Sequence, residues 1–438
     1  MFFKFFKYKG ICYEFIDIAA CENLNMKSYC ILLAISLLFV LNSSGFIIQS
    51  KYTKRHINLA NDHNVMSQSH YLWEIEGKPP SYIFGTIHVP YIMLWDAIPK
   101  NMMQAFNNTQ SLFLELDMSE DTLLVLQSCQ QLPNNHTVSE VLPSDIYLKF
   151  VAYMEHVYAK IGKWLTGSQK NQGLTSDIVF NLLFDGWECR RPIWTLMKMQ
   201  MVIKSLITSI EYPQLDSYLG DLGRRHGKFV GGIENVNDTC SIINNIDESQ
   251  VLFILNKTLG QNYGAFSTML DSTEQEFENL VKHYRDGTIA PNYFTRRHAF
   301  FPQLYKIEES NGSRSLNIDV AKDKQMATEI DTYLRHHIIF KRNELMTEGI
   351  IDLIENNKNS SFFFAFGVGH FIGKNSVIDM LQEKGRRTVR VSRYKVIPES
   401  NPGSSLKNSS TPVDNHCTCE QYRFLSWFMC ILQCALGF

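Results

Sequence analysis

Two histidines in this chain follow a glycine at the same spacing. The segment "SYIFGTIHVP" (81–90) places His88 three residues after Gly85, and "FFFAFGVGHF" (362–371) places His370 three residues after Gly367. Each glycine ends an apolar run that is typical of a buried strand. Glycine permits a sharp turn and lets a ligand approach the backbone closely. The repeat therefore predicts that two imidazoles lie at the ends of two buried strands.

Two carboxylates also follow strand-like runs. Glu115 lies in "SLFLELDM" (111–118), and Glu234 ends "KFVGGIE" (228–234). Ligands of α/β sheets collect beyond the carboxyl ends of the strands, so we expect His88, Glu115, Glu234 and His370 to share one site. Two imidazoles with carboxylates suit a divalent metal that keeps a position for water. Such water becomes a nucleophile near neutral pH, and a spare carboxylate can take its proton.

Each of these residues also has a purely structural interpretation. A single histidine after a strand is more often a hydrogen-bonded structural residue than a ligand, Glu115 could cap a strand, and Glu234 could lie in a surface turn. His336 and His337 are adjacent on a predicted helix and point in different directions, so we do not expect them to share a metal. The sequence contains no H-E-x-x-H and no G-x-S-x-G. "GVGHFIG" (367–373) resembles a dinucleotide fingerprint, but the next strand ends without an acid for the ribose.

The elements that must position these residues alternate between strands and helices. Strands are predicted within 81–90, 111–118, 228–234, 362–371 and 388–394, and helices within 96–107, 144–210, 213–225, 249–285 and 325–357. A further helix is predicted from a capping box at Ser376 and Asp379 to a stop at Gly385. Residues 286–324 are predicted to form a surface loop, and 50–70 a short lead-in. This order predicts an α/β fold: a central mixed sheet with helices on both faces, two strand–Gly-x-x-His–helix modules and a large helical insertion.

The two ends of the chain have a different composition from the body. Residues 31–41, "ILLAISLLFVL", have the length of a signal peptide, so residues 1–48 are predicted to be a leader, with 1–25 a possible gene-model extension before Met26. A signal anchor is the alternative. Residues 422–438 are predicted to be a hydrophobic membrane anchor after a tether at 396–421. This anchor is either a single spanning helix of a type I protein or a signal for a GPI lipid.

Composition and modification motifs favour an extracellular body. Of the 438 residues 45% are hydrophobic, the formal charge is −2, and no basic stripe occurs, so we expect no nucleic-acid partner. The body holds only Cys129, Cys189 and Cys240, which allows at most one internal disulfide and leaves one thiol over. N-glycans are predicted at N-x-S/T sequons. These are Asn42, Asn107, Asn135, Asn237, Asn256, Asn311, Asn359 and Asn408.

Several longer blocks resemble one known family. They are "GTIHVPY", "FLELD", "LPSDIY", "GWECRRPIW", "EIDTYLRHHIIFKRNE" and "FFFAFGVGHFIGKN". In this order they resemble the Tiki family of Wnt-cleaving membrane metalloproteases, which belongs to the TraB-like superfamily. The resemblance implies a catalytic ectodomain at about 70–395 that cleaves the amino-terminal region of Wnt proteins and so inhibits Wnt signalling. It also implies a divalent metal, Mn²⁺ or Co²⁺, and it maps the family's two Gly-x-x-His motifs onto His88 and His370.

The resemblance extends to further residues. Glu115 and Glu234 lie in matching strands, and Arg342 and Asn343 in "KRNE" match a family block. We interpret this pair as polar groups that orient a carboxylate or the substrate carbonyl, with a helix-surface role as the alternative. Matching cysteines imply a Cys129–Cys240 disulfide with Cys189 free. The alternative function is a non-catalytic Wnt-binding, metal-binding or haem-binding ectodomain on the same fold.

Overall fold

A computed structural model describes residues 71–200, 202–260, 263–290, 301, 304 and 317–398. The chain divides into two compact units, Met1–Val65 and Met66–Phe438, and all described residues belong to the second. The predicted leader, the anchor, most of the tether and three sequons (Asn42, Asn311 and Asn408) lie outside the described residues. Within the described residues, no helix is both long and apolar enough to cross a membrane.

A mixed sheet of six strands organises the second unit, in the order β4-β3-β5-β2-β1-β6. The β2, β5, β3 and β4 strands run parallel, whereas β1 pairs antiparallel with both β2 and β6. The α/β prediction is therefore confirmed. The bounds are β1 Leu72–Ile75, β2 Ser81–Thr86, β3 Ser111–Leu114, β4 Phe229–Gly232, β5 Phe362–Gly367 and β6 Thr388–Arg390. The sequence prediction missed β1, because its four residues are too few to show a strand period.

The two central strands are the ones that carry the Gly-x-x-His motifs. All six residues of β2 and all six of β5 are buried. This is why both strands read as continuous apolar runs, since a parallel strand with covered faces has no solvent side. Thr86 pairs with Gly367 in the parallel register, so both motifs leave the sheet at the same edge and side by side.

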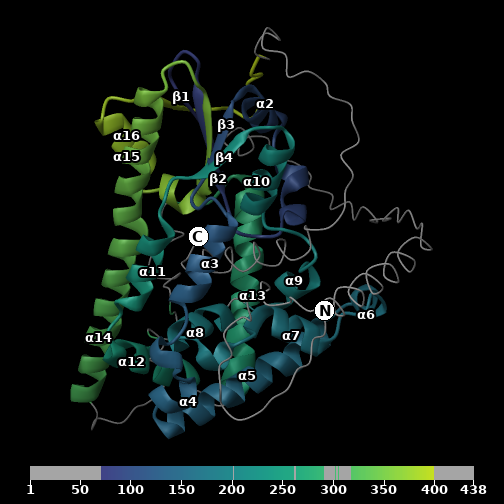
Figure 1. Ribbon diagram of the computed structural model, residues 1–438, viewed down its shortest axis with the longest axis vertical. Helices are drawn as coiled ribbons and strands as arrows, with labels where there is room; N and C mark the ends of the chain where they lie inside the picture. Colours follow the sequence, from purple (N-terminus) through teal and green to yellow (C-terminus); the bar gives the residue numbers. More distant parts are fainter. Residues whose placement is uncertain are drawn as a thin grey trace, which may run out of the picture. The chain divides into compact units, whose positions relative to one another are not determined.

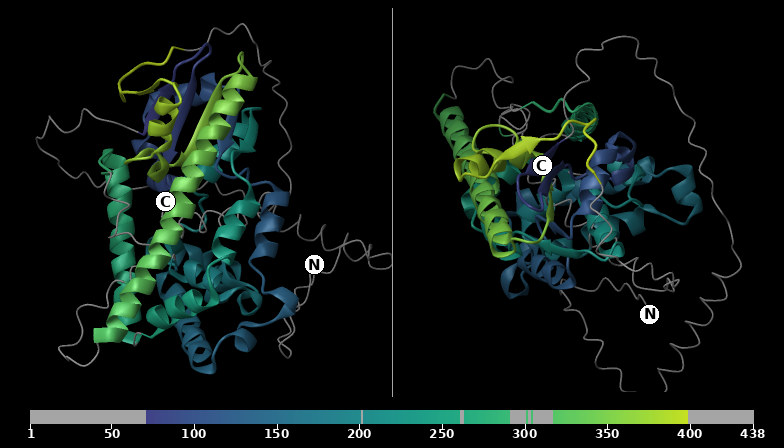
Figure 2. Two further views of the ribbon diagram at one scale, coloured as in Figure 1. Left: turned by 90° about the vertical axis from the view of Figure 1, so that its left-hand side faces the viewer. Right: turned by 90° about the horizontal axis from the view of Figure 1, so that it is seen from above.

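Helices cover both faces of the sheet. In Figure 1, α15 (Lys341–Asn356) and α16 (Val377–Glu383) lie on one side of the strands, and α2 (Lys100–Asn108) and α10 (Leu215–Arg225) on the other, an arrangement that Figure 2 also shows. The α16 helix starts at the predicted Ser376–Asp379 capping box, and Gly385 follows its end with a φ of +80°. These helices fix the sheet edge from which the site residues project.

A helical insertion follows the strand ends. It contains α3 Glu120–Cys129, α4 Val138–Val141, α5 Ser144–Trp164, α6 Gly167–Asn171, α7 Ser176–Phe184, α8 Pro192–Gln200, α9 Lys204–Thr208, α11 Val236–Asn244, α12 Glu248–Leu259, α13 Tyr263–Asp286 and α14 Asn317–Arg335. Shorter turns are η2 Tyr91–Met93, η3 Trp95–Ala97, η4 Pro133–Asn135, η5 Trp187–Cys189, the π-helix η8 His336–Phe340, and η9 Val368–Phe371.

One boundary of the predicted loop at 286–324 is wrong. The α14 helix already begins at Asn317. The Gly-, Asn- and Ser-rich composition of the preceding residues masked this start, although Ala321, Lys322 and Lys324 are good helix formers. Most of the remaining loop lies outside the described residues.

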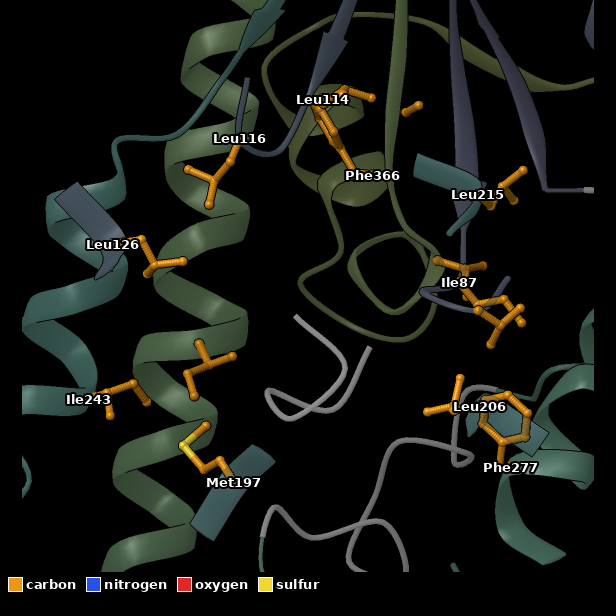
Figure 3. Close-up of a cluster of buried hydrophobic side chains, with 14 of the residues drawn as sticks. Ile87, Leu114, Leu116, Leu126, Met197, Leu206, Leu215, Ile243, Phe277 and Phe366 are labelled. Carbon is orange, nitrogen blue, oxygen red and sulfur yellow. The ribbon is translucent and has the colours of Figure 1, made fainter. Parts of the chain in front are cut away.

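The hydrophobic core continues from the sheet into the helical insertion. Figure 3 shows Leu114 and Phe366 at the ends of β3 and β5, Ile87 and Leu215 near the end of β2, and Leu206 with Phe277 among the helices. All six side chains are buried. The carboxyl edge of the sheet is therefore enclosed by packed helices, so polar groups at this edge lie in a low-dielectric environment.

A disulfide joins two helices of the insertion. Cys129 at the end of α3 is bonded to Cys240 in α11, with their Cα atoms 6.0 Å apart, which confirms the predicted pair. The predicted free thiol at Cys189 is wrong, because Cys189 is also disulfide-bonded. The prediction counted only the three cysteines of the body, whereas the other cysteines of the chain lie outside the described residues.

Candidate metal centre

Gly85 lets the two Gly-x-x-His modules pack against each other. A Cβ at this position would lie 2.9 Å from Tyr71 Cβ and 3.0 Å from Val368 Cγ2. Val368 belongs to the second module, between Gly367 and His370. Glycine is thus required by close approach, and any larger residue would push the two modules apart.

His88 is held by a carboxylate that the sequence prediction missed. Its Nδ1 lies 2.8 Å from Asp216 Oδ2, and the Thr86 hydroxyl donates to Oδ1 of the same carboxylate. A carboxylate only accepts hydrogen bonds, so His88 donates from Nδ1, which leaves Nε2 as the ring atom that can bind a metal. Asp216 and His88 are both buried. This is the arrangement in which carboxylates orient metal-binding histidines.

The sequence does contain a weak signal for Asp216. Asp216, Gly220 and Gly223 recur at the spacing of one helix face, and all three are buried in α10. A Cβ on Gly223 would lie 3.0 Å from Leu112 Cδ2, so this face packs directly on the sheet. An acid on the same helix face as two such glycines is therefore expected to be buried. The sequence prediction gave only a helix at 213–225 and did not single out Asp216.

His370 is held in the same tautomer by an amide. Its Nδ1 lies 2.6 Å from Asn343 Oδ1, while Asn343 Nδ2 donates to the Asn375 carbonyl at 2.8 Å. The second bond identifies the nitrogen of the amide, so His370 must donate from Nδ1 and keep its lone pair on Nε2. Burial, together with the charge of Arg342, lowers the His370 pKa to about 3. The imidazole is therefore neutral, which is the form that binds metals.

Glu115 lies between this histidine and Arg342. Its Oε2 accepts from Arg342 Nη2 at 2.5 Å, and its Oε1 accepts from the Gly367 N–H at 2.5 Å. The same Oε1 is 3.9 Å from His370 Nε2. Burial would raise the Glu115 pKa, but the charge of Arg342 is the largest of the opposing effects, and the pKa is lowered to about 2. Glu115 is therefore a buried carboxylate that stays ionised.

Glu234 joins the cluster through Arg342. Arg342 Nε donates to Glu234 Oε1 at 2.8 Å and to Oε2 at 3.1 Å. Burial raises the Glu234 pKa to about 7, because Arg342 offsets the desolvation only in part and the Glu115 charge adds to it. Arg342 lies at the start of α15, and Glu234 lies two residues after the end of β4, so one guanidinium connects the helix to two strand ends. The helix-surface alternative for Arg342 and Asn343 is excluded, since both are buried.

The residues present fit a divalent ion in part. Among the described residues, no three His, Cys, Asp or Glu side chains are arranged as a metal-binding group. The donor chemistry nevertheless fits at the two imidazoles, because both donate from Nδ1 and so leave Nε2 as the atom that can bind an ion. Glu115 Oε1 lies 3.9 Å from His370 Nε2, so Glu115 is the carboxylate that would join the imidazoles in holding an ion. Glu234 is held by Arg342 instead, so the four-ligand set stays a prediction.

Comparison with known proteins agrees with the sequence blocks. The model of the TraB/PrgY/gumN family matches residues 71–390. The chain belongs to the TraB/PrgY/gumN family. Among curated proteins it is 36% identical over 344 residues to Metalloprotease TIKI2 of Xenopus tropicalis, which covers 76% of this chain and 63% of that protein.

Two further relatives extend this similarity within the TraB/PrgY/gumN family. Metalloprotease TIKI1 of Homo sapiens is 35% identical over 346 residues, covering 78% of this chain and 65% of that protein. The Metalloprotease TIKI homolog of Nematostella vectensis is 30% identical over 349 residues, covering 77% and 70%. The predicted resemblance to the Tiki family is confirmed. No solved structure matches the chain. The match to the Xenopus tropicalis TIKI2 protein thus spans less than two thirds of that relative's length.

Proposed function

We propose that this chain is a metal-dependent endopeptidase that cleaves the amino-terminal region of Wnt proteins and so inhibits Wnt signalling. The proposal is supported by relatives that are named metalloproteases and by the resemblance of the sequence blocks to the Tiki family. The observation that carries it is the pair of buried imidazoles at adjacent strand ends, each donating from Nδ1 to a buried acceptor. Structural histidines have no need to share this tautomer at one sheet edge.

The residues divide into a metal-binding and a supporting set. His88 and His370 would hold the ion through Nε2, with Glu115 as the nearest carboxylate. When bound, a divalent ion lowers the pKa of water and polarises the scissile carbonyl. Arg342 keeps the Glu115 and Glu234 carboxylates in place, and Asn343 fixes the His370 ring. Glu234, whose pKa burial raises to about 7, is the carboxylate whose pKa best suits accepting a proton from the nucleophile and returning it to the leaving amine.

The proposed setting is the cell surface. The body would face outside, carry N-glycans and be tethered through residues 422–438 as a type I membrane protein, with a GPI anchor as the alternative. The Cys129–Cys240 disulfide supports an oxidising compartment. The sequons within the described residues support glycosylation, because each asparagine is exposed: Asn107, Asn135, Asn237, Asn256 and Asn359. By resemblance the ion would be Mn²⁺ or Co²⁺.

Mass spectrometry of a Wnt amino terminus tests the proposal directly. A purified Wnt protein is incubated with the full chain, with the full chain plus a chelator, and with the chelated chain after Mn²⁺ or Co²⁺ is restored. We expect a shortened Wnt amino terminus only in the first and third samples. Wnt that stays intact in all three would overturn the proposal, and cleavage that survives chelation would remove the metal from it.

The same experiment decides the non-catalytic alternative. One observation favours that alternative: Arg342 occupies both oxygens of Glu234 and one oxygen of Glu115. A Wnt protein that binds the chain stably, yet keeps its amino terminus when metal is supplied, would establish a binding ectodomain.

A further inference from the structure

Asp216 reaches His88 from a distant part of the chain. The two residues are 128 positions apart, and Asp216 is the second residue of α10. Its carboxylate makes two hydrogen bonds, one from the His88 ring and one from the Thr86 hydroxyl two residues earlier. Thr86 ends β2 and His88 follows it by two residues, so the Asp216 carboxylate is hydrogen-bonded to this strand end at two points.

Backbone hydrogen bonds also join the segment after His88 to the segment around the start of α10. Leu215 N–H donates to the Val89 carbonyl at 3.0 Å, and Tyr91 N–H donates to the Pro213 carbonyl at 2.9 Å. These bonds form a short antiparallel bridge centred on Pro90 and Gln214. The Tyr91 and Tyr218 rings stack beyond it with centroids 4.0 Å apart. The residues that follow His88 are therefore joined to the start of α10, which sets the position of Asp216 relative to the ring.

We propose that Asp216 is a positioning residue of the metal centre: it fixes His88 with the lone pair on Nε2, and its negative charge makes His88 the stronger of the two imidazole donors. The inference rests on the proposed function, since it takes His88 as a metal ligand. A carboxylate that accepts from the far nitrogen raises the basicity of a metal-binding imidazole. Asn343 accepts the same kind of hydrogen bond from His370 Nδ1, but its amide carries no charge.

The location of Asp216 suits an acidic side chain. It lies in the first turn of an eleven-residue helix, where the unpaired backbone N–H groups favour a negative side chain. The Thr86 hydroxyl, free to rotate, donates to the oxygen that His88 does not use. Both carboxylate oxygens are thus engaged, and neither is left to compete with His88 for an ion.

Titration with Co²⁺ tests this role without requiring cleavage. The purified full chain and its Asp216→Ala, Asp216→Asn and His88→Ala variants are titrated while the visible absorption of the bound ion is recorded. Thermal unfolding in chelator gives the stability of each metal-free protein. Asp221→Asn is the matched control, because Asp221 lies on the same helix and pairs with Arg224 at the surface.

We expect Asp216→Ala to weaken Co²⁺ binding by about 10–100-fold, the usual cost of losing such a partner. Asp216→Asn keeps an oxygen for the His88 Nδ1–H and presents an N–H₂ to Thr86, so the ring stays in place and the loss should be smaller, about 10-fold or less. Asp221→Asn should leave the affinity unchanged. If Asp216→Ala does not fold, Asp216→Asn alone decides, because only a loss of charge weakens its binding.

Failure of this inference differs from failure of the proposed function. If His88→Ala loses Co²⁺ while both Asp216 variants bind it as tightly as the unaltered chain, Asp216 is only structural and the inference is wrong. If His88→Ala binds Co²⁺ normally, the metal centre itself is wrong, and the inference falls with it. A chain whose Co²⁺ affinity depends on His88 and Asp216 but which never cleaves Wnt would overturn the proposed function alone.

Discussion

The two Gly-x-x-His modules have the same spacing and leave the sheet at the same edge, yet they place their histidines in different electrostatic environments. His88 donates to the Asp216 carboxylate, which comes from α10 on one face of the sheet. His370 donates to the Asn343 amide, which comes from α15 on the other face. A buried carboxylate supports one ring, and a neutral group supports the other.

The difference follows from what surrounds each ring. His370 already has Glu115 Oε1 at 3.9 Å, and Arg342 is the neighbour of Asn343 in the chain. A second carboxylate at position 343 would add another buried negative charge to Glu115 and Glu234, with one guanidinium to balance three. It would also place an oxygen against the Asn375 carbonyl, where the Asn343 amide now donates. The repeat in sequence therefore places both imidazoles at one sheet edge, while the charge around each imidazole is set by distant residues.

The largest effect should come from removing either imidazole. His88→Ala and His370→Ala are each expected to abolish Wnt cleavage. Each variant keeps one of the two imidazoles, and one imidazole is not expected to hold the ion. The folded structure should persist, since both positions lie at strand ends rather than within β2 or β5. Cleavage assays and circular dichroism measure the two results. If one variant cleaved normally while the other did not, the two modules would not share one ion.

The next largest effect concerns Arg342, which belongs to the His370 side. Arg342→Met leaves the Glu115 and Glu234 carboxylates buried without their cation, which should lower the free energy of unfolding by about 3–5 kcal/mol. The control is Arg387→Met at the exposed Arg387–Glu76 pair, which should change it by about 0–1 kcal/mol. Urea unfolding of both variants measures the difference. Equal effects would mean that Arg342 is not the cation that holds these carboxylates.

A smaller effect is expected at the amide. Asn343→Ala removes the acceptor for His370 Nδ1, so the ring can rotate and Co²⁺ binding should weaken by about 10–100-fold. Asn343→Asp should not restore it, because the carboxylate cannot donate to the Asn375 carbonyl. Absorption titrations with Co²⁺ compare the two variants. Tight binding by Asn343→Asp would show that the two modules tolerate the same partner.

Local patterns in the sequence were enough to predict the strands that carry the site. The β2 and β5 runs are apolar throughout because both strands are buried on both faces, and the glycine at each end marks where the backbone turns. The same reasoning placed Glu115 and Glu234 at neighbouring strand ends. The family resemblance, rather than any pattern, supplied Arg342, Asn343 and the Cys129–Cys240 pair.

What the sequence could not provide were the pairings between distant residues. Asp216 is joined to His88 only because α10 packs on the sheet through Gly220 and Gly223. Arg342 donates to Glu234, and this pairing depends on where α15 begins. The disulfide at Cys189 was missed because the prediction considered only the three cysteines of the body. These facts depend on packing, which local periodicity does not encode.

The smallest effect should come from Gly85, where the two modules touch. A methyl group from Gly85→Ala would lie 2.9 Å from Tyr71 Cβ and 3.0 Å from Val368 Cγ2, so the β1 and β5 ends must shift. Overpacking of this kind should lower the free energy of unfolding by about 1–3 kcal/mol. Gly167→Ala is the matched control, because no atom lies within 4 Å of a Cβ there, and we expect a change of less than about 1 kcal/mol. Urea unfolding compares the two.

Because Val368 precedes His370 by two residues, Gly85→Ala should also weaken Co²⁺ binding, whereas Gly167→Ala should not. Loss of stability with unchanged Co²⁺ affinity would show that the second module moves as a rigid piece and that the contact between the modules serves folding alone.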